Sequence, residues 1–360
     1  MCKRIGKVIV DDLVNEILYE EKNSLRAEKK RAWSPKKTKA PFYDRARYKS
    51  KINSFQAALD LAEKIVNMLG APWKPAKRGR PSIYSPSKVT IALLCKHFFD
   101  LSFERLREKL IDIKYDCRKR NKINEGRPIP CRSELHWASL KVPEEYFDEA
   151  KRLIDEQTAK LHGDLFGTTE LNKFAVDGTS NQCDELEEAL IACKPRLRRK
   201  TDKVNALIRL VTNTVSEISS SERENQKDLR KLLEKRKSSG RSIKNIEVVA
   251  DRDYDVEYNY KYAEKNGVKL TIKPKLYQGK MYKGNFRTKV QASYSSKTYR
   301  TRKKAERPFG NMFCRDGNKI HYKRPDMKEK GELLRVIAHN MKAYFMQEAW
   351  GKIFTNFYIS

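Results

Sequence analysis

Metal-binding cysteine and histidine motifs are missing from this chain of 360 residues. Its seven cysteines form no C-x-x-C pair and its five histidines are scattered, which argues against a zinc site. Long hydrophobic runs are also missing, since none approaches the ~18 residues that a membrane-spanning helix needs. Acids appear too soon after the first residue for a signal peptide. We therefore expect a cytoplasmic protein with reduced thiols and no membrane partner.

Acidic residues are scarce relative to basic ones. The chain has 78 Lys and Arg against 47 Asp and Glu, and the net charge of +31 is spread along its whole length. Adaptation to a hot habitat is one explanation of a highly charged protein, but it enriches Lys and Glu together. A polyanionic partner explains the surplus better, because binding to phosphates releases condensed counterions. We therefore expect a nucleic acid as partner. When the protein is bound to DNA, we expect it to be associated with the nucleoid.

Residues 1–50 are predicted to form a basic N-terminal arm. The segment 26–51 contains eleven Lys or Arg and only two acids. Such blocks are usually arms that lie on nucleic acid. A solvated linker has the same composition and remains the alternative.

Residues 51–165 have the pattern of an all-α DNA-binding domain. Apolar residues recur at helical spacing from Ile52 to Leu69. Further helix starts are predicted at Ser85–Pro86, Ser102, Ser133 and Pro143. Short helices with many cations fit a helix-turn-helix DNA reader, and an ordinary helical bundle has the same signature. Arg78 and Arg80, in an extended R-G-R-P stretch, suit a narrow minor groove, although four residues are a weak signal and a plain linker explains them better.

Residues 166–360 alternate strands with helices. Apolar strands are predicted within 171–180, 206–219, 246–255 and 268–275, and helices within 225–240, 258–267 and 331–350. This order predicts an α/β fold, with a mixed sheet flanked by helices.

Two apolar strands of this region each run into an aspartate, Asp177 and Asp251. Ligands collect at the carboxyl ends of strands in α/β sheets. Carboxylates on adjacent strand ends can share a pair of divalent cations about 3.5–4 Å apart, and hard cations prefer such oxygen ligands. Gly178 would let the backbone turn sharply beside Asp177. Ordinary turn acids are the alternative, because Asp is common where strands end.

Glu306 stands alone in the strongly basic run 299–310. Tyr299, Arg302 and Glu306 are spaced i, i+3, i+7, so a helix would place them on one face. On that face Tyr299 and Arg302 would grip a phosphate while Glu306 holds a metal. The alternative is a solvated helix with an i,i+4 ion pair between Arg302 and Glu306.

These segments resemble the DDE transposases of bacterial and archaeal insertion sequences, whose catalytic core is ribonuclease H-like. Tyr299, Arg302 and Glu306 match the family signature Y-x-x-R-x-x-x-E-x-x-x-x-x-x-K in register, with Phe313 at the lysine position. "FAVDGTS" resembles the first-acid block and "VVADRDYD" resembles the second, a strand followed by Asp-x-x-Tyr-Asp. The second acid is therefore assigned to Asp251, and not to Asp253 or Asp255. The likeness extends from about residue 78 to about residue 350.

The resemblance implies metal-dependent 3′-end cleavage and strand transfer of a DNA segment. The catalytic residues would be Asp177, Asp251 and Glu306, holding two Mg²⁺ or Mn²⁺ ions. The partners would be double-stranded DNA, at the terminal inverted repeats of the element and at the target, and a second copy of the chain in a homodimer. The expected DNA contacts are Tyr299, Arg302, Arg315, Lys273, Lys275, Arg78 and Arg80. Arg315 or Lys319 would replace the signature lysine.

Two other functions remain open on the sequence. One is a catalytically inactive DNA-binding protein derived from such a transposase. The other is a metal-dependent nuclease of the same fold, although such nucleases would lack the long basic helical region that precedes the first acid here. Cleavage at defined terminal repeats would indicate the transposase. Unspecific degradation would indicate the nuclease, and binding without cleavage would indicate the inactive DNA-binding protein.

Overall fold

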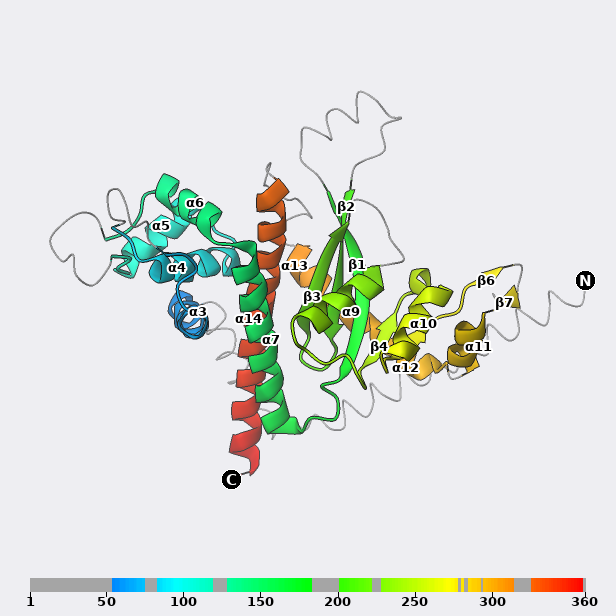
Figure 1. Cartoon of the computed structure of the whole chain (residues 1–360). Helices are drawn as coiled ribbons and strands as arrows, with labels where there is room; N and C mark the ends of the chain where they lie inside the picture. The colour runs from blue at the N-terminus through cyan, green and yellow to red at the C-terminus, as the bar shows by residue number, and fades with distance from the viewer. Residues whose placement is uncertain are drawn as a thin grey trace, which may run out of the picture.

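The computed structural model describes residues 54–74, 83–118, 128–182, 201–221, 228–277, 280–281, 284–292, 294–313 and 325–358. Two long helices, α7 (Glu144–Phe166) and α14 (Pro325–Tyr358), pack along each other through the middle of the molecule (Figure 1). A cluster of shorter helices lies on one side of this pair and a β-sheet with its own helices lies on the other. No helix in these ranges is both long and apolar enough to cross a lipid bilayer.

The helical cluster comes from the residues before the sheet. It contains α3 (Phe55–Leu69), α4 (Pro86–Phe98), α5 (Phe103–Asp112) and α6 (Arg132–Lys141). The predicted starts at Pro86, Ser102 and Pro143 are confirmed, and Ser102 accepts a hydrogen bond from the Arg105 N–H at 3.1 Å.

The predicted start at Ser133 is wrong by two residues. The N-cap of α6 is Cys131, and Ser133 lies inside the helix. The Glu134 carboxylate accepts a hydrogen bond from the Cys131 N–H at 2.8 Å, which closes a capping box around the earlier residue. The hydrogen bond from the Cys131 N–H to the Glu134 carboxylate therefore fixes the start of α6.

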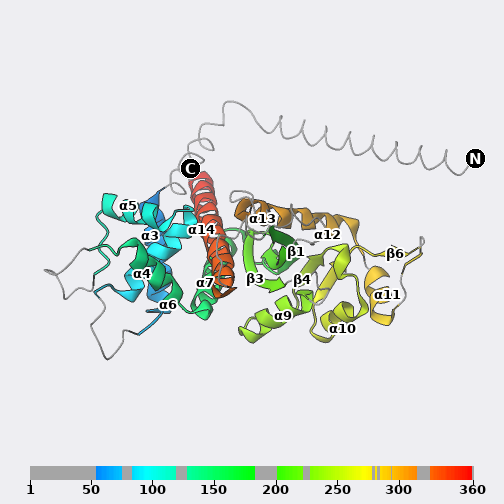
Figure 2. The same cartoon turned by 90° about the horizontal axis from the view of Figure 1, so that it is seen from above.

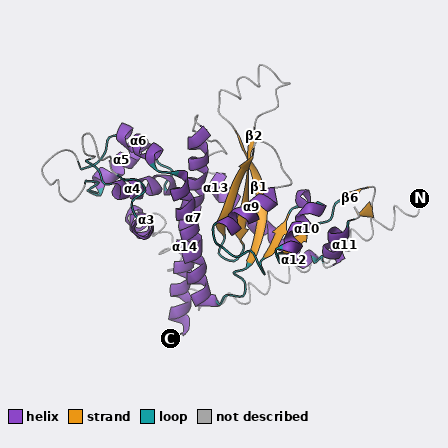
Figure 3. Ribbon diagram, in the orientation of Figure 1, coloured by secondary structure: helices purple, strands orange, loops and turns teal. Residues whose placement is uncertain are grey.

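The sheet is mixed, as predicted (Figure 3). Its strands are β1 (Lys173–Gln182), β2 (Thr201–Arg209), β3 (Thr214–Ser221), β4 (Glu247–Ala250) and β5 (Lys269–Ile272). Their order across the sheet is β3-β2-β1-β4-β5. Only β2 is antiparallel to both of its neighbours, while β1, β4 and β5 run parallel to one another. The fold class is therefore α/β, with a five-stranded mixed sheet flanked by helices.

Helices cover both faces of the sheet (Figure 2). One face packs on α9 (Asp228–Ser238) and α10 (Glu257–Lys265), through side chains that include Phe174 and Val176 of β1. Side chains alternate along a strand, so Ala175 points to the opposite face. That face is covered by α7, by α14 and by the segment that comprises α12 (Ser296–Arg300), η3 (Thr301–Ala305) and α13 (Glu306–Phe313).

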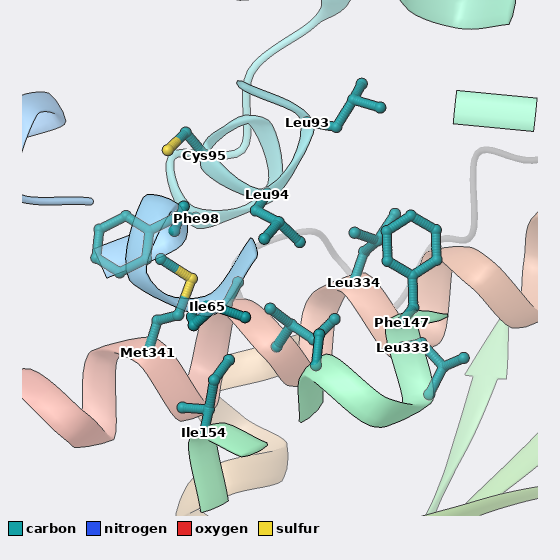
Figure 4. Close-up of a cluster of buried hydrophobic side chains, with 14 of the residues drawn as sticks. Ile65, Leu93, Leu94, Cys95, Phe98, Phe147, Ile154, Leu333, Leu334 and Met341 are labelled. Atoms are coloured by element: carbon teal, nitrogen blue, oxygen red, sulfur yellow. The ribbon is translucent and has the colours of Figure 1, made fainter. Parts of the chain in front are cut away.

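One hydrophobic core joins the helical cluster to the sheet. The side chains labelled in Figure 4 come from α3 and α4 on one side and from α7 and α14 on the other. The same cluster continues into Ala175, Ile208 and Val215 of the sheet. Asn340 of α14 reaches the backbone of β3, accepting from the Val215 N–H at 2.8 Å and donating to the Val215 carbonyl at 2.9 Å. The last helix of the chain therefore completes both the helical cluster and the sheet.

A short two-stranded ladder follows the sheet, formed by β6 (Leu276–Tyr277) and β7 (Lys280–Met281), and α11 (Asn285–Ala292) comes after it. This segment is tied to the end of β4. The buried Asp255 accepts hydrogen bonds from the Lys275 N–H at 2.5 Å and from Arg287 Nε at 2.7 Å.

Candidate active site

The two predicted aspartates lie at one edge of the sheet. Val176 of β1 and Ala250 of β4 are partners in the parallel ladder, and Asp177 and Asp251 are the residues that follow them. Parallel register therefore brings these two carboxylates side by side, although 74 residues separate them in the sequence.

The predicted end of the first strand is wrong. β1 does not stop at Asp177 but continues to Gln182, because β2 pairs with it through the whole polar stretch. What ends after Val176 is the parallel ladder with β4. Asp177 thus lies in a continuous strand whose backbone is no longer paired with β4 from this residue onward.

Glu306 reaches this edge from above the sheet face. The buried Ala305, Phe309 and Met312 pack into the core that covers Ala175, and this packing holds the start of α13 against the sheet. The expected single helix from Tyr299 to Glu306 is not continuous, because residues 301–305 form the 3-10 helix η3 between α12 and α13. The tighter turn still brings all three signature residues to the site.

Arg302 and Tyr299 connect the three carboxylates. Arg302 donates from Nη1 to Asp177 Oδ1 at 3.1 Å and from Nη2 to Glu306 Oε1 at 3.2 Å. The Tyr299 hydroxyl donates to Asp251 Oδ1 at 3.2 Å. Asp177 and Arg302 are largely buried, whereas the Glu306 side chain is 56% exposed. The sequence predicted that Tyr299 and Arg302 bind a phosphate. In this structure both side chains donate hydrogen bonds to carboxylates of the site.

The electrostatics show how closely the acids are grouped. Burial raises the pKa of Asp177, and the neighbouring charges of Asp251 and Glu306 raise it further, while Arg302 and the Gly178 N–H act in the opposite direction. Burial and Asp251 likewise raise the pKa of Tyr299, so its hydroxyl stays a hydrogen-bond donor. The site therefore concentrates negative charge that a cation would stabilise.

The donor set fits a hard divalent cation. Its three carboxylates supply oxygen ligands of the kind that Mg²⁺ and Mn²⁺ prefer, and Arg302 is the positive charge now between two of them. With the side chains as placed, no three His, Cys, Asp or Glu residues in the described ranges are grouped closely enough to chelate one ion.

Two predicted DNA contacts lie at the same edge. Lys273 follows Ile272 of β5, which pairs with Ala250, so the ends of β4 and β5 coincide. Lys273 is exposed. Lys275 Nζ lies 3.3 Å from the Asp253 carboxylate, an exposed acid two residues after Asp251.

The remaining predictions fall outside the described residues. They concern the arm 1–50 and the side chains of Arg78, Arg80, Arg315 and Lys319. Phe313, at the position of the signature lysine, is the last residue of α13.

Sequence reasoning missed the polar residues beneath the two aspartates. The Tyr254 hydroxyl donates to Asn205 Oδ1 at 2.9 Å, and Asn205 Nδ2 donates to Asp228 Oδ2 at 2.8 Å. All three are buried. A signal for Asn205 was present, since it interrupts the apolar run of β2, and Tyr254 belongs to the second-acid block.

No protein-family model matches the chain, and no curated protein does so either.

Proposed function

We propose that this protein is a DDE transposase that cleaves the 3′ ends of an insertion sequence and joins them to target DNA. The observation that carries the proposal is the convergence of Asp177, Asp251 and Glu306, from two strands and a helix, around Arg302 and Tyr299. The five-stranded mixed sheet is compatible with the ribonuclease H-like core that this class of enzyme uses.

The chemistry follows from the three carboxylates. Asp177, Asp251 and Glu306 would hold Mg²⁺ or Mn²⁺ ions, which supply positive charge at a scissile phosphate and lower the pKa of an attacking water when bound. Tyr299 keeps the Asp251 carboxylate oriented through its hydroxyl. The Arg302 guanidinium beside the carboxylates of Asp177 and Glu306 has the fork geometry that suits a phosphate oxygen pair.

DNA is the substrate that best fits the rest of the chain. The net charge of +31 attracts a polyanion, and Lys273 sits at the same strand edge as Asp251. The helical cluster shares a core with the catalytic sheet, so DNA held on that cluster would be at a fixed distance from the carboxylates. Two DNA ends must be paired for transposition, and we propose a homodimer for that step.

The test is cleavage of DNA that carries the ends flanking the gene, in the presence of Mg²⁺ or Mn²⁺. We expect Asp177→Asn, Asp251→Asn and Glu306→Gln each to lower the rate of nicking at least 100-fold while DNA binding is retained, because charge stabilisation of this kind typically contributes that much. Asp253→Asn is the matched control, since this exposed acid is adjacent to the site but is not assigned to it. If one of these three variants still cleaves DNA at the wild-type rate, the residue that it replaces does not belong to the active site.

The same experiment separates the other candidate functions. Wild-type protein that binds DNA without cutting it would be an inactive DNA-binding descendant. Cleavage that ignores the terminal repeats and joins nothing would indicate a nuclease.

A further inference from the structure

Asn205 and Tyr254 form a bridge beneath the aspartate pair. Asn205 lies on β2 directly opposite Gly178, the residue after Asp177. A Cβ at Gly178 would collide with the Asn205 side-chain amide, so the glycine leaves the space that this amide occupies. The position of the Asn205 amide is thus tied to the backbone next to Asp177.

Tyr254 is tied to Asp251 in the same way. It ends the 3-10 turn η2 (Arg252–Tyr254), whose N-cap is Asp251. The Asp251 side chain accepts from the Arg252 N–H at 2.7 Å, and the Asp251 carbonyl accepts from the Tyr254 N–H at 3.1 Å. These two hydrogen bonds leave the three-residue turn little freedom relative to the Asp251 carboxylate.

The hydrogen bond from Tyr254 to Asn205 connects these two units. It lies beyond Ala250, where the β1–β4 ladder has ended, and it joins the segment after β4 to β2, on which Asn205 is the ladder partner of Gly178. Both side chains are almost fully buried. Asn205 is itself anchored by Asp228 at the start of α9. The bridge is therefore rigid at both ends.

We propose that Tyr254 is a positioning residue: through Asn205 it fixes the separation of the Asp177 and Asp251 carboxylates, and so sets the affinity of the site for a divalent cation. This inference rests on the proposed function. Its physical basis is that ligands shared by a metal must be held within about 0.5 Å of the working geometry by residues that do not themselves touch the ion.

A purely structural role is the alternative, and Tyr260 provides the control for it. Tyr260 is also a buried tyrosine, and its hydroxyl donates one hydrogen bond, to Asp255 Oδ1 at 2.8 Å. Tyr260→Phe also removes one buried hydroxyl group and should lower the free energy of unfolding by a similar amount. It leaves the hydrogen bond between Tyr254 and Asn205 intact. Any difference between the two Tyr→Phe variants in ion affinity therefore reports the position of the carboxylates.

The experiment is a calorimetric titration of the full-length protein with Mn²⁺ in the absence of DNA. The variants are Tyr254→Phe, Asn205→Ser, the double variant, Tyr260→Phe and Asp177→Asn. We expect Tyr254→Phe and Asn205→Ser each to weaken Mn²⁺ binding about 10-fold, the lower end of the effect of residues that orient metal ligands. Because both changes remove the hydrogen bond between Tyr254 and Asn205, the double variant should lose less than the sum of the two single variants. Tyr260→Phe should bind as the wild type does.

Three outcomes overturn the inference. If Asp177→Asn abolishes binding but Tyr254→Phe and Asn205→Ser bind like the wild type, the bridge does not set the geometry, and the proposed function survives. Equal losses in Tyr254→Phe and Tyr260→Phe would show a general effect of stability. If the wild type binds no Mn²⁺, or Asp177→Asn binds it equally well, the inference and the proposed metal site fail together. If Tyr254→Phe does not fold, the Mn²⁺ affinity of Asn205→Ser relative to the wild type tests the inference.

Discussion

Arg302 donates a hydrogen bond from Nη1 to Oδ1 of Asp177 across 3.1 Å, although 125 residues separate them in the chain. The same guanidinium binds Glu306. A single positive charge therefore lies against two acids, and it opposes the burial and the charges of Asp251 and Glu306 that raise the pKa of Asp177. In the absence of a metal ion, Arg302 stabilises the arrangement on which the proposed function depends.

Replacing Arg302 by glutamine should make the stability of the protein depend more strongly on divalent cations. Without added metal we expect Arg302→Gln to lower the free energy of unfolding by about 1–2 kcal/mol, because two charge-assisted hydrogen bonds are lost in a partly buried site. Saturating Mn²⁺ should remove most of this difference, since the ion supplies the missing positive charge. Thermal unfolding with and without Mn²⁺ measures both effects.

The control for this prediction is Arg230→Gln on α9. Arg230 pairs with Glu234 at 2.7 Å, but both side chains are about half exposed, so we expect a change below about 1 kcal/mol whether or not Mn²⁺ is present. A loss in Arg302→Gln that Mn²⁺ leaves unchanged would mean that the arginine and the ion do not share the site.

Asp155 on α7 should make the protein sensitive to acid. Burial alone would raise its pKa, but Arg209 at 3.1 Å and Thr214 outweigh this effect and hold the pKa well below its usual value. A carboxylate with a depressed pKa stabilises the fold at pH values above its unfolded pKa of about 3.9, and this contribution is lost as the pH falls below that value. Denaturant unfolding between pH 7 and pH 3 should show the decline.

Asp155→Asn isolates this contribution. At pH 7 we expect a loss of about 3–5 kcal/mol, because the buried Arg209 is left with an uncompensated charge. The variant should also lose part of the dependence on pH between 5 and 3. Glu234→Gln, in the exposed pair on α9, should change neither quantity. An Asp155→Asn protein with the acid sensitivity of the wild type would show that other carboxylates control unfolding.

Gly178 and Gly310 should respond in opposite ways to alanine. At Gly178 the new Cβ would collide with the Asn205 amide, so Gly178→Ala should displace Asp177 and abolish nicking while DNA binding persists. At Gly310 of α13 a Cβ meets nothing within 4 Å, and Gly310→Ala should raise the free energy of unfolding by about 0.5–1 kcal/mol through helix propensity. Cleavage and unfolding assays on both variants test the close approach of β2 to the site; normal nicking by Gly178→Ala would contradict it.

Removing residues 1–50 should flatten the salt dependence of DNA binding. The slope of log K against log salt concentration falls by about 0.9 for each phosphate contact that is lost, and the basic segment 26–51 has a large excess of cations. Fluorescence anisotropy at several salt concentrations gives the slope for both forms. If the two slopes agree, the arm does not lie on DNA.

Local patterns in the sequence were sufficient for much of the fold. The apolar strands before Asp177 and Asp251, the helix from Pro86, and the mixed sheet with flanking helices all follow from hydrophobic periodicity and capping, which depend on near neighbours. The resemblance to a family signature added Glu306, which periodicity alone did not distinguish from a surface acid. In the structure Arg302 binds both Asp177 and Glu306, and Asp251 follows the strand beside Asp177.

Contacts between distant segments could not be predicted in this way. β1 extends to Gln182 because β2 pairs with its polar end, which no pattern within β1 reveals. Tyr254 and Asn205 are 49 residues apart, and Asp155 and Arg209 are 54 apart. From the sequence alone, charged residues at such positions are expected on the surface. A charge is buried only beside a partner, and here the partner comes near only in the folded chain.

The hydrogen bonds of Asn340 to β3 have a consequence for how the protein is made. Domains usually fold in turn as a chain leaves the ribosome, but here residues near position 340 seal a strand edge and a core that were synthesised long before. A product truncated ahead of α14 would display an open edge, which is a template for aggregation. The helical cluster and the outer edge of β3 are thus complete only after α14 has been synthesised, and a fragment that lacks α14 would lack both contacts.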